Sequence, residues 1–163
     1  MKIPRISIHD FLLLFFAIGV IGYFLSTLVI IPFISPDPVI DSFPNSCPHP
    51  NNCTRVADTN HRADNIRPPI VQANITETMK AIEEWIGPQK ILYQSENDTF
   101  VHVRWTMPLT RFRDDVLILL KSEVNNTQTV IWIQSQSRIG SYDFNTNINR
   151  VNSFIHFIES YKF

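Results

Sequence analysis

The chain has 163 residues, of which 44% are hydrophobic, and a formal net charge of −1 at pH 7. This length supports one compact domain with an appended segment. Nucleic-acid binders usually present a basic surface, and this near-neutral chain has no stripe of Lys or Arg, so the composition excludes nucleic acid as a partner.

The first predicted element is an uncharged apolar run at residues 11–34, which follows a short N-terminal stretch, residues 1–10. About 20 helical residues cross a bilayer core of about 30 Å, so the run is long enough for a transmembrane helix. A cleaved signal peptide is the alternative, but its apolar region is usually about 7–15 residues and ends at small residues. Residues 31–34, Ile-Pro-Phe-Ile, offer no such cleavage site, which favours an uncleaved anchor.

The flanking charges predict the orientation of this anchor. Lys2 and Arg5 precede it, whereas the next basic residue is Arg55. Basic residues stay on the inner side, so we expect the N-terminus inside and the rest of the chain in the periplasm, a lumen, the cell exterior or an organellar equivalent.

Residues 35–69 are rich in Pro, Asn and Asp and lack a sustained apolar period, which predicts an extended linker. The linker contains both cysteines of the chain, Cys47 and Cys53. In a non-cytosolic setting they would close a short disulfide loop. A metal site with His49 and His61 is the alternative, but the spacing is not the Cys-x-x-Cys of zinc sites. We therefore predict a disulfide, with no metal and no cofactor.

Four Asn-x-Thr sequences are glycosylation candidates if the domain enters a eukaryotic secretory lumen: Asn52, Asn74, Asn97 and Asn125. In an Asn-rich chain such triplets also arise by chance. At Asn52 a glycan and the adjacent disulfide would compete.

Residues 70–163 are predicted to form the globular domain. Helical spacing of apolar residues and strand-like alternation predict these elements in order: a helix at 73–86, strands at 90–95, 99–107, 111–121 and 129–137, and a helix at 148–161. Short connections favour a four-stranded antiparallel sheet with both helices on one face, an α+β fold in the order α-β-β-β-β-α. The opposite face is expected to be open or covered by the linker.

A polar stretch, residues 134–151, joins the last predicted strand to the final helix. The candidate ligand-binding residues come from this stretch and from the central strands: His102, Asp114, Asp115, Ser137, Arg138, Asp143, Asn147 and Arg150.

Asp114 and Asp115 are adjacent, so their side chains point to opposite faces of a strand and cannot form one acid/base pair. An inward carboxylate needs a partner, which Arg104, Arg138 or Arg150 could supply.

Two interpretations of these polar residues remain open. In the first they form a buried network of ion pairs and hydrogen bonds that holds the corner between strand and helix. In the second they bind a polar or anionic ligand, with His102 as a proton carrier. A nucleophilic Ser135 or Ser137 is not presented by a Gly-x-Ser-x-Gly turn, so an enzyme is the less favoured hypothesis.

Three motifs in this order resemble the domain-of-unknown-function 1499 family. They are the Cys-Pro…Asn-Cys pair, here Cys47, Pro48 and Cys53; Phe-x-Asp-Asp-Val at 112–116; and Ser-x-Ser-Arg-x-Gly-x-x-Asp…Asn…Arg at 135–150. The resemblance spans most of residues 45–160 and implies no established activity.

The chain departs from the family pattern at three places. Thr54 and Arg55 replace a pair of Ser, Asn145 replaces a Gly, and Ile148 replaces an Arg. Asn tolerates a left-handed backbone better than other non-Gly residues, so we expect the turn at Asn145 to survive.

Together these features predict a single-pass membrane protein that acts as a non-catalytic binding or accessory subunit of a membrane complex. The alternative is a small anionic-ligand binder or an enzyme that uses the Asp/Arg corner. A ligand site should show one polar pocket that holds His102, Arg138 and Asp143, whereas an assembly protein should show a filled corner and an apolar patch elsewhere.

Overall fold

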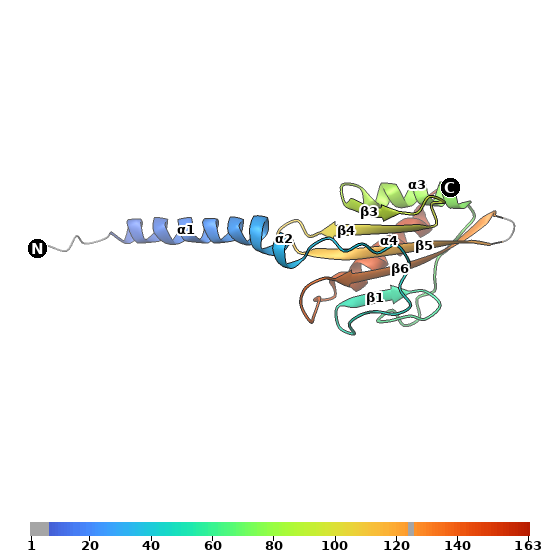
Figure 1. Ribbon diagram of the computed structural model, residues 1–163, viewed down its shortest axis with the longest axis horizontal. Helices are drawn as coiled ribbons and strands as arrows, with labels where there is room; N and C mark the ends of the chain where they lie inside the picture. The colour runs from blue at the N-terminus through green and yellow to red at the C-terminus, as the bar shows by residue number, and fades with distance from the viewer. Residues whose placement is uncertain (1–6, 124–125) are drawn as a thin grey trace, which may run out of the picture.

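The computed structural model describes residues 7–123 and 126–163. An N-terminal helical rod projects from an α+β domain (Figure 1). The rod consists of α1 (Ile8–Leu25), a π-helical turn η1 (Ser26–Ile30) and α2 (Ile31–Ile34). Lys2 and Arg5, on which the predicted orientation rests, and the predicted sequon Asn125 lie outside the described residues.

The rod has the length and composition of a membrane anchor. It is 27 residues long, an 18-residue window within it has a mean hydropathy of 2.5, and most of its apolar side chains are exposed. Its first turn is capped by Ser7, whose hydroxyl accepts a hydrogen bond from the Asp10 backbone N–H at 3.1 Å. An exposed apolar surface of this extent is expected of a helix that faces lipid, so the rod suggests a membrane anchor.

The domain is built on one antiparallel sheet with the order β1-β6-β5-β4-β3, and β2 also pairs with β6. Its strands are β1 (Cys53–Val56), β2 (Ile70–Val71), β3 (Lys90–Gln94), β4 (Phe100–Thr106), β5 (Arg113–Glu123) and β6 (Gln128–Ser137). The helices of the domain are α3 (Ile75–Ile86) and α4 (Thr146–Ser160).

The predicted α+β class and antiparallel sheet are confirmed, but the predicted strand number is wrong, because the sheet has six strands rather than four. The two additional strands are β1, which lies within the segment predicted as a linker, and β2, which follows it directly. Four and two residues are too few to show an alternating pattern, and β1 is buried at every position. Both strands gain their hydrogen bonds from β6, a partner more than 50 residues away in the chain.

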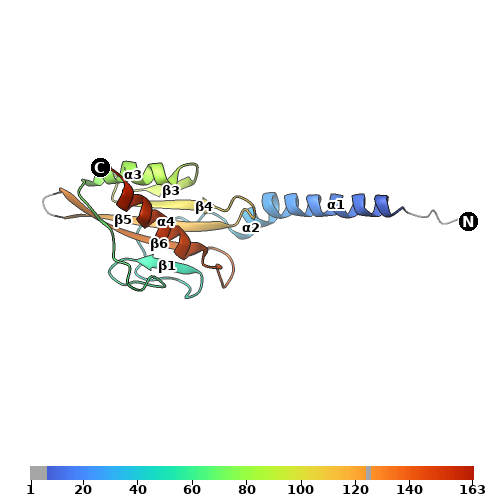
Figure 2. The same cartoon turned by 180° about the vertical axis from the view of Figure 1, so that it is seen from behind.

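Both domain helices cover the same face of the sheet, as predicted (Figure 2). Alternate residues of β4 and β5, such as Val103 and Val116, pack beneath the two helices. Trp85 of α3 contacts Trp105 of β4 and Phe154 of α4, with ring centroids 4.7 and 4.9 Å apart. This face therefore contains the hydrophobic core, and we call it the inner face.

The opposite, outer face is crossed by the chain that leaves the rod. We call residues 35–50 the strap (Figure 1). The ring of Phe43 lies 5.8 Å from that of Trp132, and Arg55 of β1 donates a hydrogen bond to the Pro44 carbonyl. Of the two arrangements expected for the outer face, open or covered, the structure has the covered one.

Candidate functional site

The two neighbouring aspartates of β5 point to opposite faces of the sheet, as the strand alternation predicted. Asp114 is paired with Trp105 of β4 and shares its inner face, whereas Asp115 lies on the outer face. Each carboxylate contacts an arginine: Asp114 Oδ2 lies 2.8 Å from Arg150 and Asp115 Oδ1 lies 2.7 Å from Arg138. The predicted site residues therefore form two clusters separated by the sheet.

The inner cluster consists of Asp114, Ser137, Asp143, Asn147 and Arg150. Besides the ion pair, the Arg150 guanidinium donates to the Ser135 hydroxyl at 2.7 Å and to the Asn147 side-chain oxygen at 2.9 Å. The Asn147 amide donates in turn to the Ser137 hydroxyl at 3.0 Å.

Burial lowers the pKa of Arg150, and the charge of Asp114 opposes this shift. Arg150 and Asp114 are 6% and 4% exposed, and Ser135 and Asn147 are fully buried. These four buried polar groups are hydrogen-bonded to one another, and the Asn147 amide extends the network to the Ser137 hydroxyl and the Asn52 carbonyl.

Asp143 of the inner cluster caps α4. Its carboxylate accepts hydrogen bonds from the backbone N–H groups of Asn145 at 3.2 Å and Asn147 at 3.1 Å, and it pairs with Arg62 at 3.0 Å. Burial raises the pKa of Asp143, but the Asn147 N–H and the Arg62 guanidinium outweigh this effect and bring it below its ordinary value. Asn145 adopts the left-handed conformation expected of it, with φ 64° and ψ 14°. The turn thus delivers Asn147 and Arg150 to the inner cluster.

The outer cluster consists of His102, Asp115 and Arg138. One oxygen of Asp115 accepts from His102 Nε2 at 2.7 Å and from Nε and Nη2 of Arg138 at 3.0 and 2.7 Å. His102 is fully buried, and its Nδ1 atom has no hydrogen-bond partner among the described residues. Proton transfer through His102 would therefore need a group that reaches Nδ1, because Nε2 is occupied by Asp115.

A carboxylate from the strap, Asp37, joins the outer cluster and was not identified from the sequence. It lies 2.9 Å from both Arg138 and Arg104 and 3.3 Å from Lys90. Desolvation would raise the pKa of Asp37, but hydrogen bonds from Arg138 and Lys90 and the charge of Arg104 hold it far below its usual range. Three cations thus converge on one carboxylate next to the C-terminal end of the rod.

Among the hollows on the domain, one is lined by residues of both clusters. This hollow, of about 340 Å³, lies between strap and sheet. Its lining includes Asp115 and Arg138 of the outer cluster and Ser137 of the inner cluster, but neither His102 nor Asp143. A second, of about 470 Å³, includes Asp114, Ser137 and Asp143. Neither of these two hollows brings His102, Arg138 and Asp143 together.

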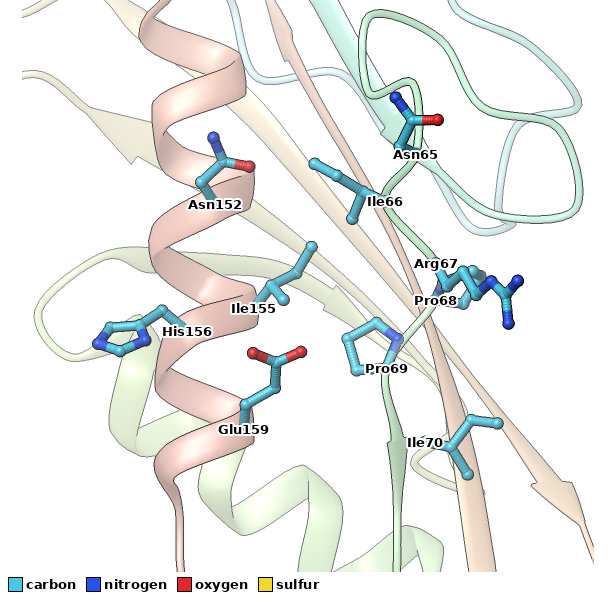
Figure 3. Close-up of a pocket in the computed structure, with 10 residues that line it drawn as sticks. All are labelled: Asn65, Ile66, Arg67, Pro68, Pro69, Ile70, Asn152, Ile155, His156 and Glu159. Atoms are coloured by element: carbon cyan, nitrogen blue, oxygen red, sulfur yellow. The ribbon is translucent and has the colours of Figure 1, made fainter.

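The third hollow, of about 550 Å³, lies between α4 and the segment that leads into β2 (Figure 3). It is bordered by Ile66, Pro69, Ile155 and Glu159, among others, and contains none of the predicted ligand-binding residues.

Cys47 and Cys53 lie at disulfide distance, with their Cα atoms 5.8 Å apart, as predicted. Among the sequons, Asn52 is 1% exposed and its amide donates to the Gly140 carbonyl, so a glycan there would require it to leave this position. Asn74 caps α3 and is half-buried, and Asn97 is exposed. Glycosylation of Asn74 and Asn97 stays a prediction.

Arg55 and Arg62 are structural arginines that sequence reasoning did not identify. Arg55 is 2% exposed and donates to the Gln134 side chain at 3.2 Å, with its guanidinium carbon 4.7 Å from the centre of the Phe43 ring. The presence of arginines in a segment without an apolar period was the available signal, but it does not reveal their partners. Within the described residues, no group of three or more His, Cys, Asp or Glu side chains could hold a metal ion.

A comparison with family models matches residues 45–158 to a family described as "Protein of unknown function (DUF1499)". Curated proteins and solved structures give no match to the chain. The matched segment begins before the disulfide and ends within α4. It therefore contains all residues of the inner and outer clusters, whereas Asp37 of the strap lies before it. Because the match covers most of its length, the chain belongs to the DUF1499 family of proteins of unknown function.

Proposed function

We propose that this protein is a single-pass, membrane-anchored accessory subunit whose domain binds other components of a membrane complex on the non-cytosolic side and performs no catalysis. The main support is the inner cluster, whose polar groups are buried and bonded to one another. Asp114, Asn147 and Arg150 hold the corner between β6 and α4, and removal of any one would leave another buried group unpaired.

The attachment of the domain to its rod also supports this role. Tyr23 of α1 donates a hydrogen bond to the Leu109 carbonyl at 2.8 Å, and Arg113 donates to the Ser35 carbonyl at 3.2 Å. These contacts hold the domain beside the end of the rod, so its partners would also be at the membrane. The basic residues before the rod and the Cys47–Cys53 pair favour the non-cytosolic side.

Affinity purification from detergent-solubilised membranes tests this proposal. The tagged full chain is compared with a chain that begins at Ser35 and with a control whose rod is replaced by an unrelated transmembrane helix of equal length. We expect stoichiometric membrane partners with the full chain and their loss from the truncated one. A full chain that is purified alone from its native membrane would contradict the proposal, and the control separates recruitment to the membrane from recognition of the rod itself.

The outer cluster supports a second candidate function, the binding of a small anion. Asp37 presents a carboxylate to Lys90, Arg104 and Arg138, as an anionic ligand would, and it belongs to the strap rather than to the sheet. A ligand carboxylate or phosphate could take its place if the strap moved away.

Asp37→Ala tests this second function, because it removes the internal carboxylate and leaves the three cations. Thermal shifts with phosphate and with succinate should then exceed those of the original chain. Arg138→Gln in the same background should abolish the gain. Equal shifts in the original chain and in Asp37→Ala would eliminate this candidate.

A further inference from the structure

Two loops at the rod end of the domain expose large apolar side chains. The β4–β5 loop exposes Leu109 by 73% and Phe112 by 47%, and the β6–α4 loop exposes Tyr142 by 53% and Phe144 by 83%. The rings of Tyr142 and Phe144 contact each other edge to face, with centroids 5.2 Å apart. Both loops lie at the end of the sheet that faces the rod (Figures 1 and 2). They form an apolar tip, which we define as residues 107–112 and 139–144.

The contact between rod and tip gives the depth of this tip in a bilayer. Asp10 is the last acidic residue before the apolar run, so the hydrocarbon begins no earlier than Phe11. About 20 helical residues are needed to cross about 30 Å, which puts the far boundary near Ile30. Tyr23, which donates to the Leu109 carbonyl, lies about 10 Å before that boundary at about 1.5 Å per residue. The β4–β5 loop is therefore level with the membrane rather than above it.

One face of the rod also turns toward the domain over this depth. Thr27 and Ile31, one and two turns after Tyr23, are only 8% and 4% exposed, unlike most of the rod. The rod side chains that precede Tyr23 are exposed. Burial of the rod by its own domain thus begins inside the predicted span.

Several backbone groups of the β4–β5 loop are hydrogen-bonded within the protein, which reduces the cost of placing them in an apolar solvent. Met107 N–H donates to the Phe112 carbonyl at 2.9 Å, and Arg111 N–H donates to the Met107 carbonyl at 3.1 Å. Pro108 has no N–H, and the Leu109 carbonyl accepts from Tyr23. Arg111, which lies within this loop, is exposed and long enough to reach lipid phosphates.

We propose that the apolar tip inserts into the outer leaflet of the bilayer, where lipid acyl chains contact Leu109, Phe112, Tyr142 and Phe144. The hollow of about 470 Å³ opens between the two loops and is lined by Met107, Phe112, Ile139 and Tyr142, among others. Acyl chains fill the apolar entrance of this hollow. The domain is then inserted into the lipid surface in addition to being attached to the membrane by the rod. The inference rests on the anchor described above but not on any protein partner.

Site-directed spin labelling of the full chain in phosphatidylcholine/phosphatidylglycerol nanodiscs tests this inference. Both native cysteines are paired, so single labels are placed at Leu109→Cys and Phe144→Cys and, as a control, at Ile70→Cys on the remote β2 strand, where the side chain is 61% exposed. Ile18→Cys in α1 reports whether the rod itself is in the bilayer.

We expect the labels at 109 and 144 to be relaxed by oxygen and protected from a water-soluble nickel chelate, like the label at 18 and unlike that at 70. A label at 18 in hydrocarbon with labels at 109 and 144 in water would overturn the inference while leaving the anchor intact. Labels at 109 and 144 shielded from both reagents would overturn it in favour of a protein contact.

A second measurement avoids the introduced cysteines. Phe144→Trp adds a fluorophore that brominated lipids should quench, after subtraction of the signal of the three native tryptophans in the parent chain. Quenching no greater than that of the parent would also overturn the inference.

Discussion

Asp114→Asn tests whether the inner cluster is structural. The change preserves the shape of the side chain and removes the charge that lies 2.8 Å from Arg150. Both residues are about 5% exposed, so the guanidinium would be left in a buried position without its counter-ion. Removing one partner of a buried pair typically costs about 3–5 kcal/mol, and we expect Asp114→Asn to lower the free energy of unfolding by that amount.

The assay is urea unfolding of the full chain in detergent, followed by tryptophan fluorescence, since Trp105 lies 5.3 Å from the Arg150 guanidinium carbon. Asp41→Asn is the control, because Asp41 is exposed and its carboxylate accepts from the neighbouring Ser42 hydroxyl rather than from a buried cation, so the midpoint of this variant should stay close to that of the original chain. The double variant Asp114→Asn, Arg150→Met should recover part of the loss, since it no longer buries a lone charge. A loss below about 0.5 kcal/mol for Asp114→Asn would refute the structural account of the cluster.

Replacing both Cys47 and Cys53 by Ser should lower the free energy of unfolding by about 2 kcal/mol through the lost loop constraint, and a reductant should have the same effect on the original chain only. The Asp37 carboxylate, whose pKa is lower when folded, stabilises the fold above the unfolded value near 4, and this contribution is lost as the pH falls further. Asp37→Asn should therefore destabilise the chain at pH 7 and differ less from it below pH 4 in parallel melts. Asp143→Ala removes the cap of α4, so we expect about 1–2 kcal/mol of destabilisation and faster hydrogen exchange at the Asn147 amide; unchanged exchange would show that the cap is dispensable.

Periodicity was sufficient to predict the elements that have a repeating pattern. The predicted helix at 148–161 is α4 (Thr146–Ser160), and the predicted strand at 129–137 is β6 (Gln128–Ser137). Alternation also predicted that Asp114 and Asp115 lie on opposite faces, because this depends only on the geometry of one strand.

Features that depend on distant partners could not be predicted in the same way. β1 has no visible period and is recognisable as a strand only beside β6. Asp37 was read as part of a linker because its partner Arg138 is 101 residues away and no local pattern connects them. The division of the candidate site into two clusters likewise follows from the pairing of the strands and the path of the strap, which are properties of the tertiary fold.

Native mass spectrometry tests the proposed function most directly. The tagged chain is produced at its endogenous level, purified in detergent and released from the detergent in the instrument. We predict that the full chain appears in a defined assembly whose mass exceeds 18.9 kDa by that of stoichiometric membrane subunits. The same chain with α1 and α2 replaced by an unrelated span should stay folded, because the inner cluster does not involve the rod. A spectrum that contains only the 18.9 kDa monomer, with or without lipid, would contradict the account of this protein as an accessory subunit.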